Sequence, residues 1–172
     1  PTEAATAAEE VAANPTANND LKAEAGLIAA KGALDNGDHN AAYSKFKAVT
    51  ALSTNMIGAE AKYHMAYVRH LQEKWTDAEK EVFDLVKKYP SYDHWKAKAF
   101  ILLGDVYVQM GDLFQAKATL QSVVNNSDEA DLVTEAQQRL DAIAASESRK
   151  NQPAPGTTDD PEIVLPDNTN GR

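Results

Sequence analysis

The sequence predicts an all-α protein built from repeated helix hairpins. In three places an alanine precedes one bulky apolar residue by four positions and another by seven; the sets are Ala42/Phe46/Val49, Ala78/Val82/Leu85 and Ala116/Leu120/Val123. The alanines are 36 and 38 residues apart, and a period of that size is typical of stacked helix-hairpin arrays. Glycine and proline are scarce within residues 21–150, as a helical domain requires.

The third hairpin, over residues 97–128, shows the pattern most clearly. Its first helix has an apolar or small face over two turns, made of Phe100, Leu103, Gly104 and Tyr107. After a break at Gly111, Asp112 and Gln115 have the spacing of a capping box, which predicts the start of a second helix. Gly104 and Ala116 are small, so the two helices of this hairpin are expected to approach closely.

This pattern resembles the tetratricopeptide repeat (TPR) family, which has small residues at the eighth and twentieth positions of each repeat and bulky ones nearby. Counted from Ala59, the second hairpin matches the family at Met65-Ala66, Trp75, Ala78, Val82, Leu85 and Pro90. Counted from Ala23, the first matches at Ala29-Ala30, Gly37-Asp38, Ala42, Phe46 and Val49. Lys62 and Arg69 depart from the pattern, since an apolar and an aromatic residue are usual there.

The resemblance implies an α-α superhelix of three TPR-like helix hairpins, with repeats at about 23–58, 59–96 and 97–128, and a C-terminal capping helix at 129–147. The helices are predicted at 20–35, 39–53, 57–72, 76–88, 94–110, 113–126 and 129–147. Thr76 and Glu79 form a second capping-box pattern. The last helix has one apolar stripe, Leu132, Ala136, Leu140 and Ile143, as expected of a helix that covers the end of a solenoid. Its residues Asp131, Glu135, Gln138 and Asp141 are expected to face away.

Both ends of the chain differ in composition from the predicted domain, residues 20–148. Residues 1–19 are acidic and contain Val11 as their single large apolar side chain, so we expect a flexible N-terminal arm without a core. Residues 149–172 are acidic and rich in proline, which predicts a flexible tail. Within it, Ile163-Val164-Leu165 is either a short docking strip or simply an aliphatic triplet. Since the sequence begins at Pro1, we expect a processed product or a C-terminal fragment of a longer chain.

Charge and motif content argue against several function classes. The formal net charge is −9 with no basic stripe, which predicts no binding to nucleic acid. No apolar run approaches the roughly 20 residues that span a bilayer, so direct membrane insertion is not expected. There is no cysteine, no glycine-rich phosphate loop and no nucleophile elbow. The four histidines, His39, His64, His70 and His94, are never three or four residues apart. The prediction is therefore no catalytic residue, no metal, no cofactor and no enzyme.

The resemblance also implies a partner-binding groove lined by the first helix of each hairpin. The groove positions of the family, carried over one by one, are Glu24, Leu27, Lys31, Leu34, Glu60, Tyr63, Tyr67, His70, Lys98, Ile101, Asp105 and Val108. Tyr63 and Tyr67 share a helix face and suit protein recognition, because each offers a rigid surface and a polar tip. The alternative is that the next helix covers them.

Three functions follow as hypotheses. The first is a non-catalytic scaffold that binds a protein or peptide segment in the groove. The second is the self-associating end of a longer TPR array, for example a homodimer. The third is an accessory module of an enzyme whose catalytic domain is absent here. The resemblance favours the periplasm or cell envelope of a bacterium over the cytoplasm.

Overall fold

The computed structural model describes residues 3–150, which form eight α-helices and no strand within that range. The helices are α1 (Glu3–Ala13), α2 (Asn19–Asp35), α3 (His39–Leu52), α4 (Met56–Leu71), α5 (Trp75–Lys88), α6 (Asp93–Gln109), α7 (Leu113–Asn126) and α8 (Ala130–Lys150). The all-α prediction is confirmed. The predicted helix ends agree with α2 to α7 within one residue, whereas α8 continues three residues beyond the predicted end.

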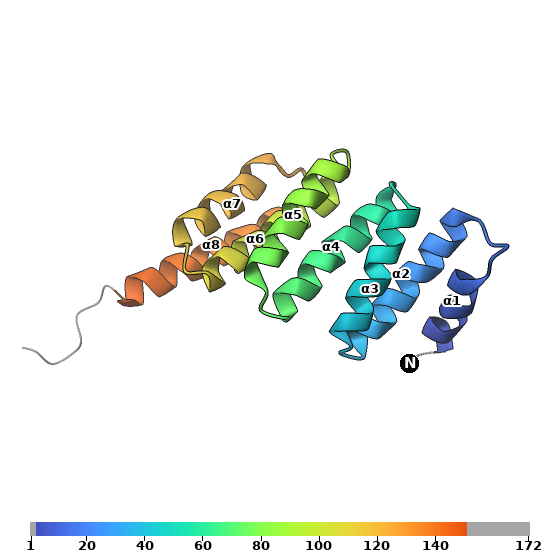
Figure 1. The fold of residues 1–172 in the computed structure, drawn as a ribbon. Helices are drawn as coiled ribbons and strands as arrows, with labels where there is room; N and C mark the ends of the chain where they lie inside the picture. The colour runs from blue at the N-terminus through green and yellow to red at the C-terminus, as the bar shows by residue number, and fades with distance from the viewer. Residues whose placement is uncertain (1–2, 151–172) are drawn as a thin grey trace, which may run out of the picture.

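The helices form an elongated row from α1 to α8 (Figure 1). Each helix packs on its neighbours in the chain, and the even-numbered helices also pack on one another, α2 on α4, α4 on α6 and α6 on α8. The backbones of the odd-numbered helices of the described part do not approach one another in this way, although side chains link them, as Tyr43 of α3 does with Glu81 of α5. The even-numbered helices therefore form one continuous layer.

The alanine-based pattern marks the core of this row. All nine residues of the three sets are at most 3% exposed. At Gly104, an added Cβ atom would lie 2.6 Å from the side chain of Leu120, so α6 and α7 touch at a position where only glycine fits. The predicted close approach within the third hairpin is confirmed.

Three turns between helices have the same backbone form. At Gly37 and Gly111 φ is +76° and +79°, and at the corresponding place between α4 and α5 Glu73 has φ +57°. The Asp112 carboxylate accepts a hydrogen bond from the Gln115 amide at 3.0 Å, so the predicted cap is confirmed. The predicted capping box at Thr76 is wrong: α5 begins at Trp75 without a side-chain cap, and Glu79 accepts a hydrogen bond from the Tyr107 hydroxyl at 2.7 Å.

The prediction of an N-terminal arm without a core is wrong. Residues 3–13 form α1, which packs on α2 through Ala8, Ala25 and Ala29. At Gly32 an added Cβ would lie 2.6 Å from the Cβ of Ala5. Because alanine and glycine let the two backbones come so close, this interface needs no bulky side chain. The predicted tail lies almost wholly outside the described residues, as do Ile163-Val164-Leu165.

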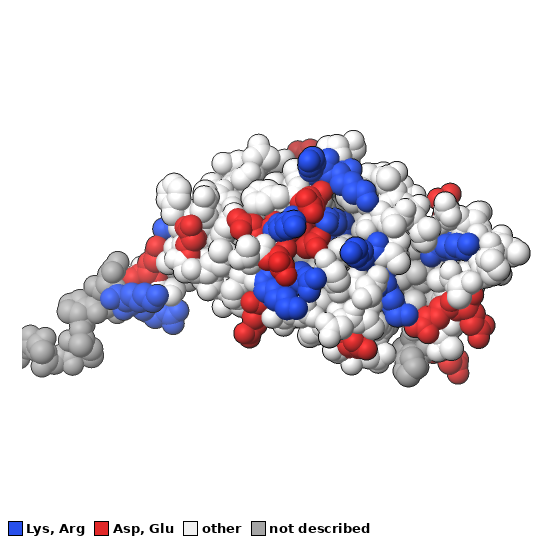
Figure 2. Space-filling view, viewed as in Figure 1, with Lys and Arg blue, Asp and Glu red and all other residues white. Residues whose placement is uncertain are grey.

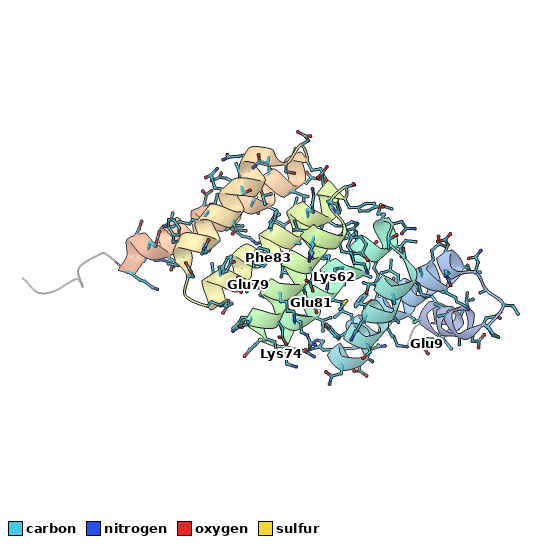
Figure 3. All side chains as sticks on the ribbon, turned by 45° about the horizontal axis from the view of Figure 1, so that its top comes forward. Glu9, Lys62, Lys74, Glu79, Glu81 and Phe83 are labelled. Atoms are coloured by element: carbon cyan, nitrogen blue, oxygen red, sulfur yellow. The ribbon has the colours of Figure 1, made fainter. Side chains whose placement is uncertain are left out.

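A polar network replaces the apolar packing that the family pattern leads one to expect at Lys62 and Arg69. The Lys62 ammonium group pairs with the Glu81 carboxylate and lies 3.4 Å from Asp84 (Figure 3). The Tyr43 hydroxyl donates to Glu81, and the Arg69 guanidinium lies 3.7 Å from the centre of the Tyr43 ring. Lys62 and Glu81 thus pair across two helices, which makes their burial tolerable. The Arg69 Nε is buried without a hydrogen-bond partner in the described structure.

Candidate functional site

Two adjoining pockets lie on the layer of even-numbered helices. The first, of about 90 Å³, is lined by Tyr63, Tyr67, His70, Lys98, Ile101, Leu102, Asp105, Glu135 and Arg139. The second, of about 330 Å³, is lined by Asp105, Val108, Gly111, Leu113, Arg139, Ala142, Ile143, Ser146 and Lys150. Because Asp105 and Arg139 belong to both, the pockets form one surface across α4, α6 and α8. We call this the α4–α8 surface.

An ion pair stands where the two pockets meet. Arg139 Nε lies 2.9 Å from both carboxylate oxygens of Asp105, and Arg139 NH1 lies 3.1 Å from Glu135 Oε1. The pair joins α8 to α6, and the two side chains remain about one third exposed, at 32% and 34%. One guanidinium serves two carboxylates here, so this junction can exchange charged hydrogen bonds with a ligand on either side.

Aromatic side chains form the wall of the smaller pocket. The Tyr63 and Tyr67 rings are stacked with centroids 6.4 Å apart, and the Tyr63 ring lies 5.5 Å from that of Trp95 on α6. Burial is the main cause that raises the pKa of the Tyr63 hydroxyl to about 12. Tyr63 was expected to be an exposed recognition residue; α6 packs against its ring and leaves it half-buried, and the ring still lines the smaller pocket.

The ammonium group of Lys98 lies against two aromatic rings. Its Nζ lies 5.3 Å from the ring centres of both Tyr63 and Trp95, and it forms no ion pair with any carboxylate of residues 3–150. The contacts to two aromatic faces stabilise the ammonium group. Lys98 therefore remains available to an acidic ligand group at the edge of the smaller pocket.

The structure brings seven of the twelve predicted groove residues to this surface. They are Tyr63, Tyr67, His70, Lys98, Ile101, Asp105 and Val108. Lys31 and Glu60 instead form an ion pair between α2 and α4, and Glu24 is exposed on α2.

Leu27 and Leu34, which were also predicted to line the groove, line neither of the two pockets. Leu27 is buried in the core of the first hairpin, and Leu34 packs against that core. Seven of the seventeen residues of α2 are alanine or glycine, so Leu27 and Leu34 supply the bulk that the core of this hairpin needs.

The α8 side of the surface was missed from the sequence. Glu135, Arg139, Ala142 and Ser146 line the pockets, although Glu135 was expected to face away from the array. These residues follow one another at intervals of four, three and four, which is a helical stripe. That periodicity could have identified them, but the stripe contains few apolar residues, and of its members the sequence analysis considered Glu135 alone.

His64 lies between the aromatic wall and the first hairpin. Its ring stacks on Phe46 with centroids 4.9 Å apart, and its Nδ1 has no hydrogen-bond partner in the described structure. Burial, followed by the charge of Lys31, lowers the pKa of His64 to about 4, so the imidazole is neutral at pH 7. No cluster of three or more His, Cys, Asp or Glu side chains within residues 3–150 could hold a metal ion.

The opposite side of the row carries a mixture of charges. Figure 2 shows lysine and arginine interleaved with aspartate and glutamate over α5. Interleaved charges of both signs neutralise one another at short range, so this face presents no single-sign patch in the view. No helix among the described residues is long and apolar enough to cross a membrane.

No family model matches the chain, and no curated protein matches it. The chain is similar to a solved crystal structure, that of BtubC (BKLC) from P. vanneervenii, with a TM-score of 0.63 and 14% sequence identity. The match covers 95% of this chain and 78% of that one. At this identity the similarity shows a shared fold alone.

The prediction that the chain is not an enzyme is corrected by this match. That prediction relied on missing catalytic motifs, whereas the similarity to BtubC is a similarity of fold at 14% identity, which leaves enzymatic activity open. The exclusion of catalysis is therefore withdrawn.

Proposed function

We propose that the protein is a TPR-like scaffold that binds an extended polypeptide segment on the α4–α8 surface. The observation that carries this proposal is the continuity of the two pockets across three successive even-numbered helices. In the proposed architecture, α2 to α7 are the three helix hairpins of an α-α superhelix, and α8 covers its end. The three similar turns at Gly37, Glu73 and Gly111, spaced 36 and 38 residues apart, support a repeated unit.

The dimensions of the surface fit a short extended segment. Packed helices lie about 8–10 Å apart, so a ligand that crosses α4, α6 and α8 spans about 20 Å. A chain that rises about 3.3 Å per residue covers this distance in about six residues. The segment would place an apolar side chain beside Val108 and Ile143 and polar groups near Lys98 and the Asp105–Arg139 pair.

A peptide-display selection against the intact chain tests the proposal. We expect selected peptides to lose affinity for a Lys98→Glu variant by about tenfold, since a cation at the edge of the pocket becomes an anion. Lys80→Glu is the matched control, because Lys80 is exposed on α5 and lines neither pocket. Selected peptides that bind the Lys98→Glu variant as tightly as the original chain, or that are lost with Lys80→Glu, would contradict the proposed site.

A further inference from the structure

We propose that the larger pocket of the α4–α8 surface binds a segment of this same chain, residues 161–166, and that partner peptides must displace it. The inference rests on the proposed function, because it names a competing occupant for the same surface. The segment is Pro161-Glu162-Ile163-Val164-Leu165-Pro166, which lies outside the described residues.

The chemistry of the pocket matches that of the segment. Val108, Leu113 and Ile143 give the pocket an apolar wall, and its charged lining residues are Asp105, which pairs with Arg139, and Lys150. The segment offers three consecutive aliphatic side chains. Its flanking carboxylates are Asp159, Asp160, Glu162 and Asp167, and residues 159–167 contain no basic residue. An aliphatic strip with acidic flanks therefore meets an apolar pocket whose charged lining, Asp105, Arg139 and Lys150, is positive in sum.

The connection between pocket and segment is short enough to favour binding within one chain. Lys150, the last residue of α8, itself lines the pocket. Residues 151–160 can span at most about 33–36 Å when fully extended. The distance along α8 from Lys150 back to Arg139 is about 16 Å at about 1.5 Å per residue. The segment can thus return to every part of the pocket.

The two prolines lower the cost of binding. Pro161 and Pro166 each fix their own φ, and each disfavours helical conformation at the preceding residue. The aliphatic strip is therefore biased toward the extended form that the pocket would accept. A short flexible linker gives an effective concentration in the millimolar range. A segment with an intrinsic Kd of about 0.1 mM would then lower the apparent affinity of a partner peptide about tenfold.

A second apolar groove is a weaker candidate for the binding site of the segment. The apolar groove between α5 and α7, beside Phe83 and Thr119, is also open, but no charged rim points to a particular ligand there. The larger pocket has both the charge pattern and the adjacent chain end of α8, so we place the segment in it.

Paramagnetic relaxation in the intact chain tests the inference without a partner. The chain has no cysteine, so Asn168→Cys introduces a single attachment site for a nitroxide label. We expect selective broadening of amide signals from Val108, Ala142 and Ser146. The same broadening should disappear when Ile163→Ser and Leu165→Ser are added. Absence of broadening at the pocket, or broadening that survives the double substitution, overturns the inference.

An exposed position on α8 provides a second variant that should leave the fold intact. Ala142→Glu places a carboxylate in the pocket and should remove the broadening, because it repels the acidic segment. Ala144→Glu is the matched control, since Ala144 is exposed on the same helix and does not line the pocket. Equal broadening in both variants contradicts the assigned position.

Partner affinity separates this inference from the proposed function. Peptides selected by display should bind the Ile163→Ser/Leu165→Ser chain about tenfold more tightly than the original chain. Selected peptides that bind the α4–α8 surface equally well in both chains overturn the internal segment alone. Selected peptides that bind elsewhere overturn the proposed function, while the relaxation measurement still decides whether the segment occupies the pocket.

Discussion

The Arg139 side chain places Nε 2.9 Å from both carboxylate oxygens of Asp105 and so joins α8 to α6 at the meeting point of the two pockets. Because both groups are partly exposed, water screens the pair. We expect Arg139→Ala to lower the free energy of unfolding by only about 1 kcal/mol. Urea titration of the intact chain measures this change. Arg149→Ala is the control on the same helix, since within residues 3–150 the Arg149 side chain donates one hydrogen bond, to the Ala145 carbonyl oxygen, and forms no ion pair. A loss equal in both variants contradicts a specific role for the pair.

Replacement of Glu73 by glycine should stabilise the folded chain. Its φ of +57° lies in the left-handed region, where a residue with a Cβ atom is strained, and Gly37 and Gly111 occupy the two similar turns. We expect Glu73→Gly to raise the free energy of unfolding by about 1 kcal/mol. Thermal and urea unfolding measure the gain. Glu73→Ala keeps the Cβ and should give no such gain; a gain of the same size in both variants would assign the effect to the carboxylate instead.

Replacing the small residues between paired helices by larger ones should destabilise the chain. Gly104→Ala would bring a Cβ within 2.6 Å of the Leu120 side chain, and Ala116→Leu would add three carbons at a fully buried position. Each should destabilise the chain by about 1–3 kcal/mol through overpacking. Gln109→Ala, near the end of α6, should change stability by less than about 0.5 kcal/mol. Unfolding midpoints of the first two variants that match the original chain would show that this packing can relax freely.

The sequence predicted those features that depend on one local pattern. The pattern of Ala116, Leu120 and Val123 occurs in all three hairpins, and its residues are buried in each. The pattern is regular because close helix packing demands a small residue followed by large ones on the same face. The Asp112 cap was predictable for a similar reason, since donor and acceptor lie three residues apart. The position of Tyr63 was not, because only the packing of α6 on α4 decides whether its ring is covered.

Features that depend on distant partners were missed or misjudged. In the sequence, Lys62 departs from an apolar pattern. The structure shows why a lysine fits there, because it pairs with Glu81, nineteen residues away. Arg139 appears as a surface residue until Asp105, on another helix, is placed beside it. The helix α1 was missed as a packed element because its interface consists of alanine and glycine, which carry almost no hydrophobic signal in a sequence.

Acid should destabilise the chain through His64. Its pKa in the folded state is about 4, below the ordinary value of 6.5, because the ring is buried beside Phe46 and near Lys31. Between these two values the unfolded chain binds more protons than the folded one, so stability is full above about pH 6.5 and falls as the pH drops toward 4. The full loss, complete below about pH 4, is roughly 3 kcal/mol, and about 2 kcal/mol of it falls between pH 7 and pH 5. Urea unfolding at pH 7 and pH 5 measures it. A His64→Gln variant should lose this part of the pH dependence, and an unchanged dependence would assign it to other groups.

Substitutions of Tyr63 and Tyr67 should differ in their effects on stability and on peptide binding. The Tyr63 ring packs against Trp95 and the core, so Tyr63→Ala should lower the free energy of unfolding by roughly 2–3 kcal/mol. Tyr67 stacks on Tyr63 from one side and lines the smaller pocket, so Tyr67→Ala should cost less stability and weaken selected peptides by several fold. Urea unfolding and peptide titration on the same preparations compare the two effects. Phe114→Ala is the control for loss of an aromatic ring, because Phe114 is 78% exposed on α7 and lines neither pocket of the α4–α8 surface. If Tyr67→Ala unfolds the chain as strongly as Tyr63→Ala, both rings belong to the core and peptides must rely on Lys98, Asp105 and Arg139 instead.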